Sequence, residues 1–284
     1  MVALYTIMIY NAALNIFLPY TMRKPGPKIV VFDLDETLGC FVEVGMFWDA
    51  LEHTLGSKLK QEQFFEVMEM FPEFVRPNIY KILSFLKKKK KEGDCKHVMI
   101  YTNNQGNRTW TEMIAAYFDM KTKSKFFDQI IAAFKVRGKI VEICRTSHDK
   151  SVDDLLRCTR MPRGTQICFL DDQFHPLMED DDVYYINVKP FTHSLPFATM
   201  ADRYWAKVSP HMDRKTFVNR ITSFMQGYSF TVTEKSSAED NVDAIVGKQI
   251  LVHLKDFFSQ TPQDGGGSRK RNPRTRKAMT RRHR

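Results

Sequence analysis

Cysteine is scarce in this sequence, and the five cysteines that it contains form no framework. They are scattered, odd in number and without a C-x-x-C pair, which argues against a disulfide scaffold and against a cysteine zinc cage. We therefore expect free thiols and an intracellular, reducing compartment, either the nucleus or the cytoplasm. Internal repeats are also missing. The apolar content of 43% and the aromatic content of 12% are those of a folded globular protein.

Acidic residues are missing from residues 265–284, which hold nine lysines or arginines. The formal net charge of +10 is therefore a property of this segment, and the rest of the chain carries only about +1. A glycine linker opens the segment and a proline interrupts it, so we expect a disordered basic tail. The basic residues of 269–284 are typical of a segment that contacts nucleic acid or another acidic partner, or of a nuclear localisation signal. A tail that only increases solubility is the alternative.

Charged residues are missing from residues 1–22, which are mostly apolar. The segment is about as long as a helix that spans a bilayer, but it lacks the basic start and the cleavage site of a secretory signal. Three interpretations stay open, namely a membrane anchor, a buried helix, and a start assigned too early. The third would place the true start at Met22, directly before an apolar strand.

Between residues 23 and 200, short apolar runs alternate with segments of helical periodicity. The runs are continuous, as in parallel strands that are buried on both faces. Strands separated by helices predict an α/β fold, with a parallel Rossmann-like sheet flanked by helices. We expect only a small insertion at 39–75, too short for a full cap domain, and a helical extension at 201–264. The expected strands are 28–35, 97–104, 127–134, 165–173 and 183–188, and the expected helices are 46–55, 60–71, 76–90, 108–118, 150–159, 213–226 and 242–258.

Polar side chains follow three of the expected strands, at the carboxyl edge where open α/β sheets bind their ligands. Four carboxylates gathered at one edge raise one another's pKa unless a cation neutralises them. Oxygen ligands of this kind suit Mg²⁺ together with a substrate phosphate. The side chains are Asp33 and Asp35 after the first strand, Thr102 and Asn103 after the second, and Asp171 and Asp172 after a later one.

The spacing of Asp33 and Asp35 predicts covalent phosphoryl transfer. As the strand ends and the chain curls over the site, Asp33 can face phosphorus while Asp35 reaches the leaving-group oxygen. One carboxylate then attacks phosphorus to form an aspartyl-phosphate, and the other acts as general acid and base. Thr102, Asn103 and the backbone N–H groups near them are candidate phosphate ligands. Lys150, at the start of a helix, is the candidate that bridges an aspartate to the phosphate.

Four stretches, "VVFDLDETLG", "IYTNN", "HDKS" and "FLDDQ", stand in the order of the four motifs of the haloacid-dehalogenase (HAD) superfamily. The chain resembles this superfamily over residues 28–191. The glutamate of D-L-D-E-T-L and the run "FVRPNIYKIL" resemble more narrowly the phosphatases of the RNA polymerase II C-terminal domain, also called NLI-interacting-factor-like. The resemblance implies a HAD-like phosphatase domain over residues 23–200.

The resemblance also implies roles for individual residues. Asp33 would be the nucleophile and Asp35 the acid and base. Mg²⁺ would be bound by the Asp33 carboxylate, the Asp35 carbonyl and Asp172. Asp171 would contact either the metal shell or Lys150.

Two departures from the family pattern concern the substrate more than the chemistry. Asp172 stands where many members have asparagine, and Asn103 and Asn104 stand where a small residue is usual. We expect a Mg²⁺-dependent phosphatase that acts on phosphoserine or phosphothreonine in a protein similar to the polymerase tail, because a site with little cap is open to large substrates. The alternatives are a nucleic-acid 3′-phosphatase, and a non-catalytic, transcription-linked module that binds phosphopeptide or nucleic acid.

Overall fold

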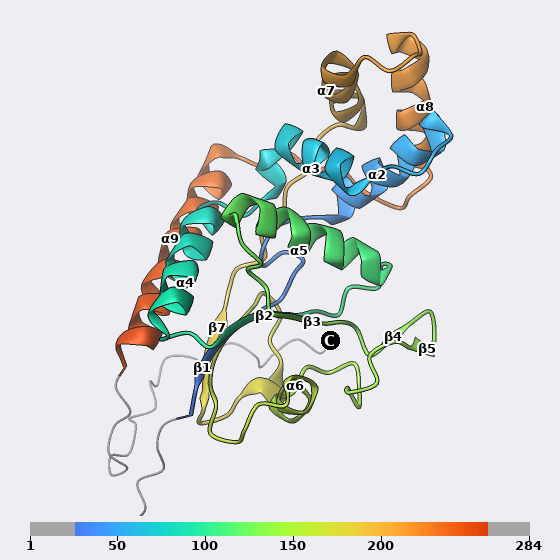
Figure 1. Cartoon of the computed structure of the whole chain (residues 1–284). Coiled ribbons are helices and arrows are strands. Elements are labelled where there is room, and N and C mark those ends of the chain that lie inside the picture. The colour runs from blue at the N-terminus through green and yellow to red at the C-terminus, as the bar shows by residue number, and fades with distance from the viewer. Residues whose placement is uncertain (1–25, 261–284) are drawn as a thin grey trace, which may run out of the picture. The chain divides into compact units, whose positions relative to one another are not determined.

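The structure, a computed structural model, describes residues 26–260, and its main sheet has five strands that all run parallel. The strand order is β3-β2-β1-β6-β7, so β1 lies in the centre (Figure 1). The α/β class that the sequence predicts is confirmed. The strands are β1 Lys28–Phe32, β2 His97–Tyr101, β3 Gln129–Ile131, β6 Gln166–Asp171 and β7 Val183–Asn187.

The central position of β1 follows from its continuous apolar run. Every residue from Ile29 to Phe32 is buried, and Phe32 lies opposite Ile100 on one side and Leu170 on the other. Because the strands run in the same direction, their carboxyl ends meet at one edge of the sheet. The strand order reverses between β1 and β6, and such a switch point is where open α/β sheets bind ligands.

Helices cover both faces of the sheet. Those labelled α4, α5 and α9 lie on one face, and α6 lies on the other (Figure 1). Alternate residues of β1 accordingly belong to two cores, with Val30 and Phe32 in the larger one and Ile29 and Val31 in the one that α6 covers. The helices are α2 Val42–Leu55, α3 Gln61–Met70, α4 Ile79–Glu92, α5 Arg108–Thr122, α6 Val152–Thr159, α7 Phe197–Val208, α8 Arg214–Gln226 and α9 Ser237–Ser259, with 3-10 turns η1 Pro72–Phe74 and η2 Pro176–Met178.

The insertion after β1 forms part of a helical lobe. Its helices α2 and α3 pack against α8 and α7, which come from the opposite end of the described chain (Figure 1). The sequence predicts α8 but no separate helix at α7. The buried residues of α7, namely Met200, Ala201 and Tyr204, do have a helical spacing, so the pattern that indicates this helix is present in the sequence.

The last helix, α9, packs against α4. It begins at Ser237, ahead of the start at residue 242 that its apolar pattern predicts. Gly247 lets α9 approach the start of α4, because a Cβ at this position would lie 2.1 Å from the Pro77 carbonyl oxygen. The buried carboxylate of Asp243 forms ion pairs with Lys189 and Lys235. These contacts tie α9 to the segment that follows β7.

A short antiparallel hairpin follows β3, where the sequence predicts no further strand. It consists of β4 Lys135–Val136 and β5 Lys139–Ile140. Its turn is the pair Arg137 and Gly138, whose φ angles are 49° and 78°. Two-residue hairpin turns require this left-handed backbone, and they normally use asparagine, aspartate or glycine. Arginine in the first position gives no turn signal, which is why the sequence does not predict the hairpin.

Two of the expected segments lie outside the described residues, namely the apolar segment 1–22 and the basic tail 265–284. Among residues 26–260, no helix is both long enough and apolar enough to cross a membrane. The membrane anchor and the tail therefore stay predictions.

The buried carboxyl of Glu43 predicts how the free energy of unfolding depends on pH. This carboxyl accepts the backbone N–H of Leu195, and burial raises its pKa from 4.5 to about 7. Between these pH values the folded protein binds the proton more tightly than the unfolded chain does, so the free energy of unfolding falls as pH rises through this window. Glu43→Gln should flatten this slope in urea unfolding experiments, whereas Glu62→Gln, at an exposed site of α3, should not. An unchanged slope in Glu43→Gln would contradict the assignment.

Candidate active site

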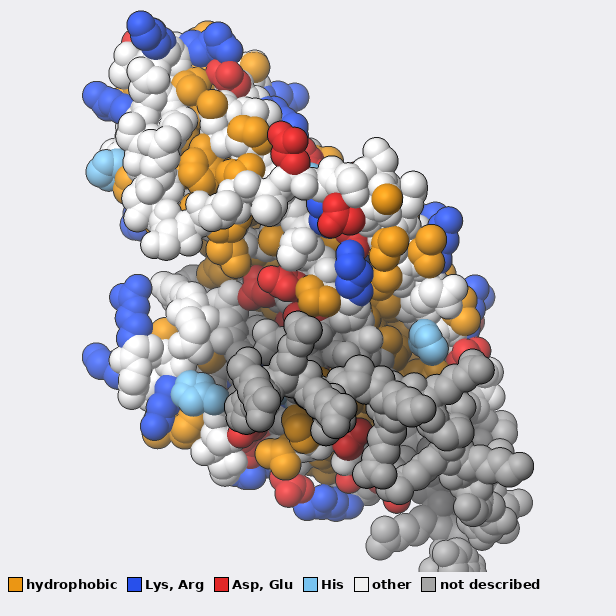
Figure 2. Space-filling view, turned by 180° about the vertical axis from the view of Figure 1, so that it is seen from behind, with side chains coloured by type: hydrophobic (Ala, Val, Ile, Leu, Met, Phe, Trp, Pro, Cys, Tyr) orange, Lys and Arg blue, Asp and Glu red, His pale blue; other side chains and the backbone are white. Residues whose placement is uncertain are grey.

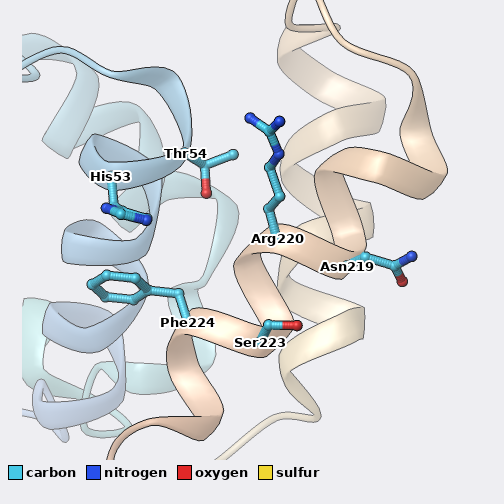
Figure 3. A pocket seen from close by; sticks show the side chains of 6 residues that line it. All are labelled: His53, Thr54, Asn219, Arg220, Ser223 and Phe224. Carbon is cyan, nitrogen blue, oxygen red and sulfur yellow. The ribbon is translucent and has the colours of Figure 1, made fainter.

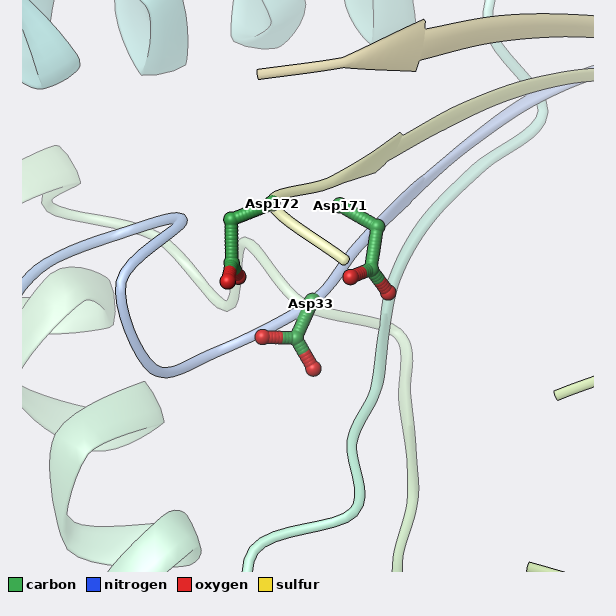
Figure 4. Close-up of side chains that lie close together, drawn as sticks. All are labelled: Asp33, Asp171 and Asp172. Atoms are coloured by element: carbon green, nitrogen blue, oxygen red, sulfur yellow. The ribbon is translucent and has the colours of Figure 1, made fainter. Parts of the chain in front are cut away.

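Three aspartates meet at the carboxyl edge of the sheet, where β1 and β6 lie side by side. Asp33 follows β1, and Asp171 and Asp172 stand at the end of β6. One carboxylate oxygen from each lies within 4.8 Å of the others, and the three side chains point into the same space (Figure 4). Asp33 and Asp171 are buried and Asp172 is half-buried. Like charges are therefore held close together, away from bulk water.

A buried lysine supplies the opposite charge. Lys150 lies in the segment that leads into α6, and its side chain is only 2% exposed. Its ammonium donates to Asp33 Oδ1 at 2.5 Å and to Asp171 Oδ2 at 2.6 Å. The rings of Tyr101 and Phe169 lie 5.8 and 5.9 Å from the same nitrogen. The lysine that the sequence analysis singled out thus lies between the expected nucleophile and an aspartate of β6.

The positive charge of Lys150 compensates the carboxylates of this cluster to different degrees. Burial raises the pKa of Asp33 to about 7, although the ammonium of Lys150 opposes the rise. Burial also acts on Asp171, but a hydrogen bond from His175 and the attraction of Lys150 hold the pKa of this carboxyl below its usual range. Despite burial, the two carboxylates hold the pKa of Lys150 above its ordinary value. Lys150 is therefore a fixed cation, and Asp33 is the carboxylate that most needs further positive charge.

Asp35 lies beside the cluster, with its carboxylate turned toward the loop that follows β2. Asn104 Nδ2 donates to Asp35 Oδ2 at 2.6 Å. The other oxygen, Oδ1, is buried and has no hydrogen-bond partner among the described residues. Burial raises the pKa of Asp35, which favours the protonated form that a general acid needs. The unpartnered Oδ1 is the atom that the expected proton transfer would use, and the metal contact that the resemblance implies would fall to the backbone carbonyl of Asp35.

The end of β2 brings the expected phosphate ligands to the same edge. Thr102 is buried, and its Oγ1 accepts the backbone N–H of Asn104 at 3.0 Å. The hydroxyl hydrogen of Thr102 is then left for a ligand. Asn103 instead has a buried side-chain oxygen without a partner among the described residues. The side-chain NH₂ of Asn103 is nevertheless a donor, so Asn103 stays a candidate phosphate ligand beside Thr102.

Arg76 braces the loops that carry the site, a role that the sequence analysis missed. Its buried guanidinium donates to the backbone carbonyls of Glu36, Thr37 and Lys189, the last at 2.9 Å. The loop after β1 is thereby joined to the loop after β7. Burial lowers the pKa of Arg76 to about 10. Its place in "FVRPNIYKIL" contributes to the family resemblance, but nothing local in that run indicates its distant partners.

Two further contacts hold the edge of the sheet in place. Thr37 Oγ1 donates to Asp172 Oδ1 and accepts the Asp172 backbone N–H, both at 3.1 Å. Arg145 donates to the carbonyl oxygens of Thr102 at 3.1 Å and His148 at 2.9 Å. The D-x-D-x-T spacing therefore ties the loop after β1 to the end of β6, and Arg145 ties the end of β2 to the loop that carries Lys150.

Cys144 and Cys158 form a disulfide, which corrects the expectation that the thiols are free. The two residues are 14 positions apart and lie on either side of Lys150. The bond therefore ties the loop before α6 to the end of that helix. Their spacing matches no motif, and whether two cysteines can pair depends on the distance between their Cα atoms, here 5.0 Å. The other cysteines, Cys40, Cys95 and Cys168, are buried and free.

The donor set at the sheet edge fits a hard divalent cation. Among the described residues, Asp33, Asp171 and Asp172 are the only group of histidine, cysteine, aspartate or glutamate placed to hold a metal ion. The ammonium of Lys150 contacts Asp33 and Asp171 but not Asp172, and Asp33 has a raised pKa. Carboxylate oxygens are the ligands that Mg²⁺ prefers. A Mg²⁺ ion held by Asp33 and Asp172 would offset the excess negative charge.

A separate pocket of about 470 Å³ lies between α2 and α8 in the helical lobe (Figure 3). The rings of His53 and Phe224 face each other there, with their centres 4.7 Å apart. The pocket has no carboxylate, so it lacks both the nucleophile and the acid that the sheet edge provides. Its lining residues are His53, Thr54, Asn219, Arg220, Ser223 and Phe224.

Comparison with known proteins adds no family assignment. No protein-family model matches this chain, and no curated protein matches its sequence. The assignment of a function consequently depends on the geometry of the sheet edge and on the motifs that the chain itself carries.

The disulfide generates a prediction about stability. Closing a loop of about this length stabilises a folded protein by roughly 3 kcal/mol, mainly by restricting the unfolded chain. Under oxidising conditions Cys144→Ser should therefore lower the free energy of unfolding by about 3 kcal/mol, as measured by urea unfolding.

A reducing agent provides the matched control for this experiment. Dithiothreitol should destabilise the wild-type protein by a similar amount and leave Cys144→Ser unchanged. A wild-type protein whose unfolding does not respond to the reducing agent would contradict the bond.

Proposed function

We propose that this protein is a Mg²⁺-dependent phosphatase that hydrolyses phosphomonoesters through an aspartyl-phosphate on Asp33. The observation that carries the proposal is the buried ammonium of Lys150, which contacts both Asp33 and Asp171. Asp35 stands nearby with one buried oxygen that has no partner among the described residues. A nucleophile, a proton donor and a fixed cation are the groups that covalent phosphoryl transfer requires.

In the first step Asp33 acts as the nucleophile. A carboxylate oxygen of Asp33 attacks phosphorus and forms an acyl-phosphate bond, while the bond between phosphorus and the leaving oxygen breaks. Asp35 gives its proton to that oxygen, so the product leaves as a neutral alcohol. The raised pKa of Asp35 keeps this proton available. The hydrogen bond from Asn104 to Asp35 Oδ2 orients the carboxyl group for the transfer.

In the second step water replaces Asp33 on phosphorus. Asp35, now a carboxylate, takes a proton from the water molecule whose oxygen attacks phosphorus. The acyl-phosphate bond then breaks, inorganic phosphate leaves, and the Asp33 carboxylate is restored. The ammonium of Lys150 has three donors, of which two bind aspartates, so one is left for a phosphoryl oxygen. The hydroxyl of Thr102 adds a further donor, and both groups stabilise charge on the transferred phosphoryl group.

Asp33, Asp172 and the Asp35 carbonyl would hold Mg²⁺ in this scheme. When bound, the ion supplies positive charge that reduces the repulsion between the Asp33 carboxylate and the anionic phosphoryl group. The hydrogen bonds between Thr37 and Asp172 prepare the second ligand for this role. The five-stranded parallel sheet with its switch point is compatible with membership of the HAD superfamily.

Phosphoserine or phosphothreonine in a protein, in a segment similar to the polymerase tail, is the substrate class that we favour. Figure 2 shows the surface hollowed between the helical lobe and the rest of the chain, with acidic side chains at the inner end of the hollow. A recess of this kind, open to solvent, suits an extended chain more than a small metabolite. The motifs that resemble the polymerase-tail phosphatases favour the same class.

The mechanism predicts the effects of two substitutions. Asp33→Asn should reduce the hydrolysis of p-nitrophenyl phosphate to the background rate, because no nucleophile is left.

Asp35→Asn should lower kcat by about a hundredfold or more on a phosphoserine peptide. It should lower kcat less on p-nitrophenyl phosphate, whose leaving group needs little protonation. Asp153→Asn, an exposed change on α6, serves as the control and should retain activity. Unchanged turnover in Asp33→Asn would contradict the mechanism.

A second experiment distinguishes the substrate classes. We expect a higher kcat/KM for a phosphoserine peptide than for an oligonucleotide with a 3′-phosphate, both in the full chain and in a chain that ends at residue 264. A higher kcat/KM for the oligonucleotide, lost when the tail is removed, would favour the nucleic-acid 3′-phosphatase. Binding of either ligand without any turnover would favour the non-catalytic module.

A further inference from the structure

A pocket of about 390 Å³ lies next to the residue that contacts Asp35. Asn104 connects the two, because its amide donates to Asp35 and the residue also lines the pocket. One wall is the loop after β2 together with the start of α5, and the other is the β4–β5 hairpin. The residues that line it are Asn104, Gln105, Gly106, Asn107, Arg108, Thr111, Ala132, Val136, Arg137 and Val141.

Two guanidinium groups give this pocket a positive charge. Arg108 stands at the first position of α5, where the helix dipole adds further positive potential. Its side chain is partly neutralised by Glu112 at 3.1 Å and Glu142 at 3.7 Å. Arg137 is exposed and forms no ion pair with any residue that the structure describes. In Figure 2, Lys and Arg side chains border the hollow on the side of the hairpin.

The conformation of Arg137 is costly for an arginine. The residue has φ of 49° at the turn of the hairpin, and this left-handed backbone is unfavourable for an ordinary L-residue. Asparagine or glycine would make the same turn at lower cost. The turn itself therefore does not require a guanidinium at this position, and Arg137 lines the pocket from this turn.

We propose that this pocket, the second-anion pocket, binds an additional acidic group of a phosphopeptide substrate, either a carboxylate or a second phosphate near the phosphorylated residue that is hydrolysed. Arg137 is the main ligand of this group, and Arg108 assists it. A planar guanidinium binds carboxylate or phosphate through two parallel hydrogen bonds. The proposal rests on the proposed function and specifies the substrate of that same site.

The walls of the pocket favour a peptide over a nucleic acid. None of its lining residues, all of which belong to the described part of the chain, is aromatic. Single-stranded nucleic acids are bound largely by stacking of bases on aromatic side chains. The apolar part of the lining consists instead of Ala132, Val136 and Val141, which suit the aliphatic portion of a peptide.

The test compares two phosphoserine peptides that differ only in one residue next to the phosphoserine, which is glutamate in one peptide and glutamine in the other. The comparison is made twice, once with this residue before the phosphoserine and once with it after. The wild-type protein should hydrolyse the glutamate peptide with a kcat/KM roughly tenfold higher in at least one of the two placements, because a hydrogen-bonded charge pair is worth that much. Arg137→Gln should abolish this preference. Lys139→Gln, which removes the same charge from the same hairpin outside the pocket lining, should retain it.

Direct binding separates this inference from the proposed function. Asp33→Asn protein should bind the glutamate peptide roughly tenfold more tightly than the glutamine peptide, and Asp33→Asn/Arg137→Gln should bind both equally. A preference that survives Arg137→Gln, or that Lys139→Gln abolishes, would overturn the second-anion pocket. So would an effect of Arg137→Gln on a 3′-phosphorylated oligonucleotide and not on the peptides. If the wild-type protein hydrolyses no phosphomonoester, the proposed function fails, while the binding comparison still decides whether the pocket exists.

Discussion

The rest of the site depends on one buried ion contact, in which the ammonium of Lys150 bridges Asp33 and Asp171. Carboxylates gathered at the edge of a sheet repel one another, and burying them without a partner is costly. One ammonium only partly neutralises the negative charge of Asp33, Asp171 and Asp172, so the site keeps an excess of negative charge that further positive charge would offset. In the proposed mechanism Mg²⁺ supplies this positive charge, and Lys150 and Thr102 provide hydrogen-bond donors for the phosphoryl group.

The scaffold keeps this unfavourable cluster in place through contacts that cross between loops. Arg76 joins the loops after β1 and β7, and Arg145 joins the end of β2 to the segment that carries Lys150. The disulfide of Cys144 with Cys158 closes that segment against α6. Each of these contacts fixes backbone outside the regular strands and helices. The aspartates can therefore stay close together although their charges favour separation.

The sequence predicts those features that local pattern determines. The apolar run before Asp33 indicates a buried parallel strand, and the same logic places Asp171 at the end of a later strand that reaches the same edge of the sheet, so three aspartates and Lys150 come together as expected. The role of Arg76 in joining two loops could not be predicted in this way, because its hydrogen-bond partners lie far away in the chain and nothing near residue 76 indicates them. The hairpin at Arg137 and the disulfide of Cys144 could not be predicted for other reasons, because turn geometry determines the first and the distance between two Cα atoms determines the second.

The central claim is that Asp33 carries the phosphoryl group during turnover. The most direct measurement is to mix the protein with Mg²⁺ and a phosphomonoester, quench the reaction with sodium borohydride, and locate the modified residue by mass spectrometry of proteolytic peptides. Borohydride reduces an aspartyl-phosphate to homoserine. The account predicts homoserine at position 33 that depends on both substrate and Mg²⁺. Unmodified Asp33 during active turnover, or homoserine at position 35, 171 or 172 instead, would contradict it.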